Sequence, residues 1–212
     1  MSVQFSTGAE CSVFTRRRQQ AYERGKGTPP QTAADVADHV FDRSAREDEH
    51  SYRYLQGRDV RRHGLRWSGM WMQYGPWLSQ PRELSIFTRP RVLLREITAD
   101  LPHCIFAVVV SEAYLNNKSI LNVLHLQDDV TALLCLAGIL NSKAVSVFYK
   151  ATAVKGARRI FPKVVARNLA EFPYPAAMTS DARQSVSHRV GRMMQLRTYP
   201  CRSAGSGGES PP

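Results

Sequence analysis

Long apolar runs are absent from this sequence of 212 residues. Its longest apolar stretches, 104–110 and 132–140, are much shorter than the roughly 18 residues that indicate a membrane-spanning helix. Residues 1–10 have neither a basic segment nor an apolar core, so no secretory signal is predicted. Both absences favour a cytoplasmic location, and an apolar content of 43% still allows a sizeable core.

Cysteine is scarce, and its positions exclude the common metal and disulfide motifs. The four cysteines lie far apart without a CxxC pair, at Cys11, Cys104, Cys135 and Cys201. Two of them fall within apolar runs, so we expect reduced thiols that mostly fill the core. The six histidines have no metal-ligand spacing either, and no metal site is predicted.

Motifs for catalysis and cofactor binding are also missing. An amino-methyltransferase holds a flipped base with Asn or Asp followed by Pro-Pro-Tyr, whereas residues 28–31 read TPPQ and lack both the acceptor and the ring. This segment is better explained as a rigid turn. No strand precedes the lone Gly-x-Gly at 25–27, so a loop for S-adenosylmethionine is not predicted. We therefore predict no catalytic residue and no bound cofactor in this chain.

Positive charge is in excess and unevenly distributed. The net charge is +11. Residues 51–100 carry nine basic and four acidic side chains and residues 141–172 carry seven and one, whereas 101–140 carry one and three. Two basic stretches around an apolar segment suit a polyanionic partner, because phosphate neutralisation releases counterions. A soluble basic surface without nucleic acid is the alternative.

Aromatic residues concentrate beside arginines in the first basic stretch. All three tryptophans lie within residues 67–77, and the arginines before them are Arg58, Arg61, Arg62 and Arg66. Interleaved aromatic and guanidinium groups can stack on unpaired bases. The alternative is a small satellite core that clamps the loop.

A second group of cations follows the most apolar segment. Lys143 and Lys150 lie near one face of a helix predicted over about 142–151. The loop after it adds Lys155, Arg158, Arg159 and Lys163. Such a loop can follow a phosphate backbone while one or two arginines reach base edges in the major groove. A solvated basic loop is the alternative.

The hydrophobic pattern predicts an α+β domain with a small mixed sheet. Branched apolar runs indicate strands over 92–97, 104–110 and 120–126. A helix over 130–140, apolar nearly all round, is expected to be buried and to begin at Asp128 or Asp129. The basic helix and loop follow it.

The remaining segments are predicted to be irregular. The N-terminal third is expected to be rich in loops, with one short helix over 32–40 capped by Thr32. Asn168 is expected to cap a last turn before Pro173. We place the domain at 14–176, with a flexible N-terminus over 1–13 and a tail over 177–212 that is disordered from about residue 203.

Several short motifs occur in a characteristic order. They read GKGTPPQT at 25–32, YLQGRDV at 54–60, YGPWLSQPR at 74–82, PRVLLREI at 90–97, YLNN at 114–117, LAGILNSK at 136–143, FPK at 161–163 and FPYP at 172–175. In this order they resemble the TaqI-like C-terminal specificity domain, the target-recognition domain of type IIG restriction-modification enzymes and related adenine-specific DNA methyltransferases.

The resemblance implies a sequence-specific grip on duplex DNA. It implies that Arg58, Arg61, Arg62 and the basic positions of 143–163 lie near the DNA. In the family a methyltransferase domain precedes this domain, so S-adenosylmethionine is expected to bind to a separate catalytic domain or subunit. A specificity subunit of a two-chain methyltransferase or endonuclease and a non-functional gene fragment are the alternatives. No signature of an RNA-binding module is found.

Overall fold

A computed structural model of the chain describes residues 4–6, 12–16, 20–153, 163–175 and 177–197. Its centre is an antiparallel sheet in the order β1-β2-β11-β8-β9. The strands are β1 (Gln4–Ser6), β2 (Ser12–Arg16), β8 (Arg91–Arg95), β9 (Ala107–Val110) and β11 (Ile120–His125). The three predicted strands therefore form the middle and one edge of this sheet, because branched apolar residues fit a pleated, buried surface.

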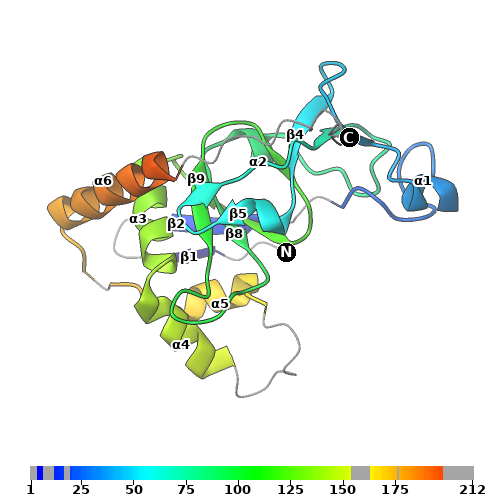
Figure 1. Cartoon of the computed structure of the whole chain (residues 1–212). Helices are drawn as coiled ribbons and strands as arrows, with labels where there is room; N and C mark the ends of the chain where they lie inside the picture. The colour runs from blue at the N-terminus through cyan, green and yellow to red at the C-terminus, as the bar shows by residue number, and fades with distance from the viewer. Residues whose placement is uncertain (1–3, 7–11, 17–19, 154–162, 176, 198–212) are drawn as a thin grey trace, which may run out of the picture.

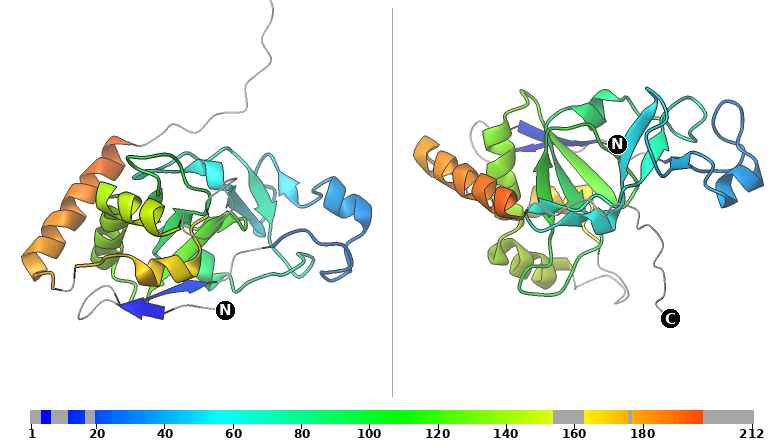
Figure 2. Two further views of the ribbon diagram at one scale, coloured as in Figure 1. Left: turned by 90° about the horizontal axis from the view of Figure 1, so that it is seen from below. Right: turned by 45° about the horizontal axis from the view of Figure 1, so that its top comes forward.

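Helices cover one face of the central sheet. They are α3 (Val130–Leu140), α4 (Lys143–Ala153), α5 (Ala166–Glu171) and α6 (Ser180–Leu196). Leu94 pairs with Leu121, and Val92 with Val123, across β8 and β11. These side chains belong to the core cluster that also contains Leu136 of α3. Figures 1 and 2 show these helices together on one side of the molecule.

A smaller mixed sheet and a hairpin cover the opposite face. The sheet has the order β10-β4-β7-β3, in which β10 and β4 are parallel. The hairpin consists of β5 (Val60–Arg61) and β6 (Gly64–Leu65), with its tip at residues 62–63. It follows the short 3-10 turn η1 (Gly57–Asp59) and packs beside β8 and β9. The elements are α1 (Ala33–Ala37), β3 (Asp42–Arg43), β4 (Ser51–Leu55), η1 (Gly57–Asp59), β5 (Val60–Arg61), β6 (Gly64–Leu65), β7 (Trp71–Gln73), α2 (Ser85–Thr88) and β10 (Leu115–Asn116).

Two helix starts confirm the capping signals in the sequence. Helix α3 begins after Asp129, whose Oδ1 accepts a hydrogen bond from the Ala132 amide over 3.1 Å. Helix α1 begins after Thr32, whose hydroxyl accepts from the Asp35 amide over 3.1 Å. The observed sheets and helices also confirm the α+β class, the buried helix and the loop-rich N-terminal third.

No single helix of the described segments is long and apolar enough to cross a membrane, although α3 and α4 pass that test as a pair bent by 60°.

The structure corrects one prediction and adds two elements that the sequence did not predict. Asn168 does not cap α5 but lies in its first turn, where its Oδ1 accepts from the amide of the cap residue Val165 over 3.0 Å. Strand β1 lies within residues 1–13, which were predicted to be flexible, and it is ordered by its pairing with β2. Helix α6 lies within the predicted tail, and part of that tail, 198–212, lies outside the described residues.

Helix α6 packs tightly on α3. Val190 is 2% exposed, and a Cβ atom added at Gly138 of α3 would lie 2.7 Å from Val190 Cγ2 and 3.2 Å from Val186 Cγ1. The absence of a side chain at Gly138 therefore lets the two helices approach each other. The end of α6 reaches the hairpin, since Arg197 donates to the Arg62 carbonyl over 3.4 Å.

Candidate nucleic-acid interface

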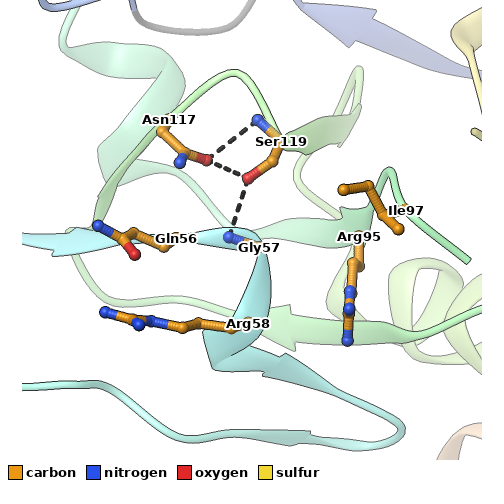
Figure 3. A pocket seen from close by; sticks show the side chains of 7 residues that line it. All are labelled: Gln56, Gly57, Arg58, Arg95, Ile97, Asn117 and Ser119. Carbon is orange, nitrogen blue, oxygen red and sulfur yellow. Dashed lines mark hydrogen bonds between the residues drawn. The ribbon is translucent and has the colours of Figure 1, made fainter. Parts of the chain in front are cut away.

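The turn η1 is fixed against the start of β11 by a close backbone approach. The Gly57 amide donates to Ser119 Oγ over 2.9 Å, and the Ser119 amide donates to Asn117 Oδ1 over 3.0 Å (Figure 3). A Cβ atom added at Gly57 would lie 2.8 Å from Ser119 Oγ, so glycine suits this contact. Arg58, the next residue, is exposed and is held at a fixed place beside the sheet.

Asp59 ties the same turn to the hairpin. Its side chain is buried and accepts from the Gln56 amide over 2.7 Å, while its carbonyl accepts from the Arg66 amide over 2.8 Å. Burial raises the pKa of Asp59, and the Gln56 hydrogen bond and the positive charge of Arg58 lower it in part. The turn and the hairpin therefore form one unit, from which arginine side chains extend.

Two adjoining cavities open around this unit. One, of about 240 Å³, lies between η1 and the ends of β8 and β10, as Figure 3 shows. The other, of about 330 Å³, lies along the hairpin, and Arg58 lines both. Their basic lining residues, which we call the arginine groove, are Arg58, Arg61, Arg66 and Arg95.

The arginine groove carries positive charge without matching acids. None of its guanidinium groups forms an ion pair within the described part of the chain, and Asp59 is the only acid in the lining. Burial and repulsion from Arg61 lower the pKa of Arg95, whose guanidinium lies 5.7 Å from the centroid of the Phe106 ring. Guanidinium groups in an accessible cavity can bind phosphate oxygens or base-edge acceptors in pairs.

Lys163 lies at the edge of this groove. It forms an antiparallel bridge with Ile97, which lines the smaller cavity, and its own side chain is exposed. The Val164 amide donates to the Glu96 carbonyl over 2.9 Å and extends this pairing. The end of the predicted basic loop is thus brought to the groove from a distant part of the sequence.

Asn141 docks the tip of the hairpin on the junction of α3 and α4. This buried side chain accepts from the Ala107 amide over 3.0 Å and donates to the Ala107 carbonyl over 2.8 Å. It also donates to His63 Nδ1 over 3.3 Å. Ser142 Oγ accepts from the Val145 amide over 3.2 Å at the start of α4. The Asn-Ser pair therefore has a structural role, and it positions Lys143 beside the hairpin tip.

The tryptophans separate into two packing groups. The rings of Trp67 and Trp71 meet edge to face with centroids 5.3 Å apart, and the Arg53 guanidinium lies 5.1 Å from the Trp67 centroid. Trp77 packs with Phe41 in another cluster. These contacts support the satellite-core interpretation, although Trp67 also lines the larger cavity of the arginine groove.

The predicted DNA-contacting residues fall into separate places. Arg58 and Arg61 line the arginine groove, and Lys163 lies at its edge. Arg62 lies at the hairpin tip, and Lys143 and Lys150 lie on α4. The residues Lys155, Arg158 and Arg159 lie outside the described part of the chain.

Sequence reasoning missed two members of the groove. Arg66 was assigned only to the arginines beside the tryptophans, and Arg95, within the strand predicted over 92–97, was not assigned to the site. The available signal was a lone cation at the end of the apolar run 92–94, which the paired hairpin approaches in space.

Several of the ordered motifs meet at this interface. Segments 54–60, 90–97 and 114–117 all contribute to the smaller cavity. Segment 136–143 reaches the hairpin through Asn141. Within the described segments, no group of histidine, cysteine or acidic side chains could hold a metal ion.

Comparison with known families supports this assembly of motifs. The family model described as the TaqI-like C-terminal specificity domain matches residues 52–174. The matched region begins in β4 and ends after α5, so it contains the arginine groove and excludes α6. A search of curated proteins finds no match.

Proposed function

Because this chain belongs to the family of TaqI-like C-terminal specificity domains, we propose that it binds duplex DNA through the arginine groove and selects a target sequence there. The family implies a DNA-recognition role in restriction-modification enzymes. The observation that carries the assignment of the site is the set of arginines around the η1 turn, which lack ion-pair partners among the described residues.

The groove suits DNA for two physical reasons. First, guanidinium groups can neutralise phosphates and can also form paired hydrogen bonds with guanine in the major groove. Second, Gly57 and Asp59 hold the backbone of the turn rigidly, so that Arg58 and Arg61 are positioned before binding. A preorganised site loses less conformational entropy when it binds its partner.

The finer assignment is to adenine-specific DNA methylation. We propose that this chain is the recognition part of a type IIG or related adenine methyltransferase and does no catalysis by itself. Methyl transfer and S-adenosylmethionine binding would then belong to a separate catalytic domain or subunit, in the cytoplasm of a bacterial cell. This division is motivated by the absence of a base-binding motif at 28–31.

The test is selection from a randomised duplex pool with the purified full chain, followed by fluorescence anisotropy on the selected duplex. A short enriched sequence is expected. Contact with about four to six phosphates should give a log–log salt slope of roughly −4 to −5. Replacing Arg58 or Arg61 with Gln should cost about 1–3 kcal/mol of binding free energy if that residue reads a base.

The matched control is Arg24→Gln, which removes the same charge from an exposed position outside the groove. It should leave the affinity nearly unchanged, and thermal melts should show that all three variants are folded. A chain that binds no duplex at low salt would overturn the proposal. Equal weakening by Arg24→Gln would reduce the binding to a net-charge effect.

A further inference from the structure

A second group of basic side chains lies on the other side of the hairpin. Arg62 Nε donates to the Asn141 carbonyl over 3.2 Å, and His103 Nδ1 lies 3.2 Å from the same oxygen. Arg197, at the end of α6, donates to the Arg62 carbonyl over 3.4 Å. Lys143 begins α4 two residues after Asn141. We call this group the tip cluster: Arg62, His103, Lys143 and Arg197.

The tip cluster has no acidic counterpart in the part of the chain that the structure describes. None of its members forms an ion pair there. Burial lowers the pKa of Arg62, and the charge of Arg197 lowers it further. Burial also lowers the pKa of His103, and the charges of Arg62, Lys143 and Arg197 lower it further, whereas the hydrogen bond to Asn141 raises it in part. The side chains are thus close enough to repel one another.

Capping of α3 explains only part of this arrangement. A cation near a helix C-terminus is favourable, and the Arg62 guanidinium and the His103 ring both contact the carbonyl of Asn141, the C-cap residue of α3. The Lys143 ammonium group has no hydrogen bond or ion pair to a described residue, and this side chain is exposed, as is that of Arg197. These two charges stand beside the capping pair at a solvent-accessible place, where an anion would offset the repulsion.

We infer that the tip cluster is a phosphate-binding site for the DNA backbone, completed by Arg197 from outside the matched family region. The inference rests on the proposed function. The hairpin then separates two tasks: Arg61 faces the groove that selects sequence, and Arg62 faces a site that binds any duplex. Because α6 is held on α3 by Val190 and Gly138, Arg197 is positioned by packing.

A backbone phosphodiester fits this site better than a free anion. Arg61 and Arg62 are adjacent in the hairpin, so a ligand that occupies the arginine groove passes close to the tip cluster. One duplex can therefore engage both sites.

The test compares Arg197→Gln with Arg189→Gln in the full chain. Both arginines are exposed on α6, but Arg189 lies roughly 12 Å along the helix axis from Arg197. Anisotropy would be measured with the selected duplex and with a scrambled duplex over a range of salt concentrations. Arg197→Gln should weaken both duplexes by the same factor, about three- to tenfold, and flatten the salt slope by about one. Arg189→Gln should leave the affinity and the slope nearly unchanged.

A second measurement separates the two sources of phosphate. Thermal melts of the wild type and of Lys143→Gln would be compared in inorganic phosphate and in chloride at equal ionic strength. A duplex effect with little stabilisation by free phosphate supports the backbone site. Stabilisation by free phosphate that depends on Lys143, without any effect on duplex binding, would overturn it.

Failure of this inference is distinct from failure of the proposed function. If Arg58→Gln weakens binding but Arg197→Gln behaves like Arg189→Gln, the arginine groove stands and the phosphate site is wrong. If the two α6 variants weaken binding equally, the effect is one of general charge and the site is again wrong. If the wild type binds no duplex, both proposals fail together.

Discussion

His63 occupies a demanding place at the tip of the hairpin. Its backbone has φ 55°, in the left-handed region, and its side chain is 2% exposed. Burial, followed by the positive charges of Arg62, Arg197 and His103, lowers its pKa to about 4. The neutral ring is therefore the folded form, and it accepts a hydrogen bond from Asn141.

Folding stability should depend on the protonation of His63. The unfolded chain takes up a proton near the ordinary pKa of 6.5 and the folded chain near 4. Stability is therefore complete above about pH 6.5, falls as the pH drops from there to about 4, and levels off below that. The loss is on the order of 3 kcal/mol.

The variant His63→Asn isolates this contribution. Asparagine tolerates the left-handed conformation and does not titrate. Urea unfolding at about pH 7.5 and about pH 4.5 should show a smaller acid-induced loss for the variant than for the wild type. Equal losses in the two proteins would mean that carboxyl groups elsewhere account for the pH dependence.

At the scale of elements, the sequence predicted the helices that have strong local signals, but it did not predict the one that depends on packing between distant residues. Helix α3 has the predicted bounds and one of its two predicted caps, Asp129, since an apolar run after a capping carboxylate is a strong local signal. Helix α6 was missed because its apolar stripe, Val186, Val190 and Met194, recurs in a mainly polar segment. This stripe packs against Gly138 of α3, and the contact joins residues that are far apart in the sequence, so no local pattern indicates it.

The candidate site was predictable in part for the same reason. The clustering of basic residues and the family resemblance together predicted Arg58 and Arg61. Arg95 and Lys163 join them through strand pairing over long sequence distances, which no local pattern contains. Arg197 reaches Arg62 only because α6 docks on α3.

The contact between α3 and α6 gives a test at this scale. Gly138→Ala should gain up to about 1 kcal/mol of helix propensity, but its Cβ atom would lie 2.7 Å from Val190 Cγ2. We expect a net loss of about 1–3 kcal/mol in the free energy of unfolding, because overpacking forces the helices apart. Hydrogen exchange should show weaker protection of α6.

Two further variants identify the cause. In Gly138→Ala with Val190→Ala the space is restored, so the double variant should lose less stability than the sum of the two single losses. Gly191→Ala, on α6 with no atom within 4 Å of its Cβ, should be neutral or stabilising. Additive losses at positions 138 and 190 would contradict the close packing of these helices.

For the molecule as a whole, the proposal that this chain binds DNA without catalysis depends on the role of residues 25–32, which contain the Pro-Pro segment. The segment 25–32 packs on the segment 74–82: the Gln31 amide donates to the carbonyls of Ala21 and Trp77 over 2.7 and 2.9 Å. Gly27 has φ 88° and lies so close to Trp77 that an added Cβ atom would be 2.3 Å from its carbonyl oxygen. The Gln31 side chain that follows the two prolines therefore holds this segment against residues 74–82.

This arrangement predicts that the chain alone transfers no methyl group. With labelled S-adenosylmethionine and the selected duplex, incorporation should stay at background. Thr28 stands in place of the acceptor amide, and Gln31, in place of the ring, is held by hydrogen bonds to the Ala21 and Trp77 carbonyls and cannot stack on a flipped adenine. Adding an adenine methyltransferase chain without its own recognition domain should restore labelling at the selected sequence, and Arg58→Gln should abolish that gain. An intact adenine methyltransferase serves as the positive control. Labelling by the isolated chain that also depends on Arg58 could not come from a contaminating enzyme, and it would contradict the assignment of catalysis to another domain or subunit.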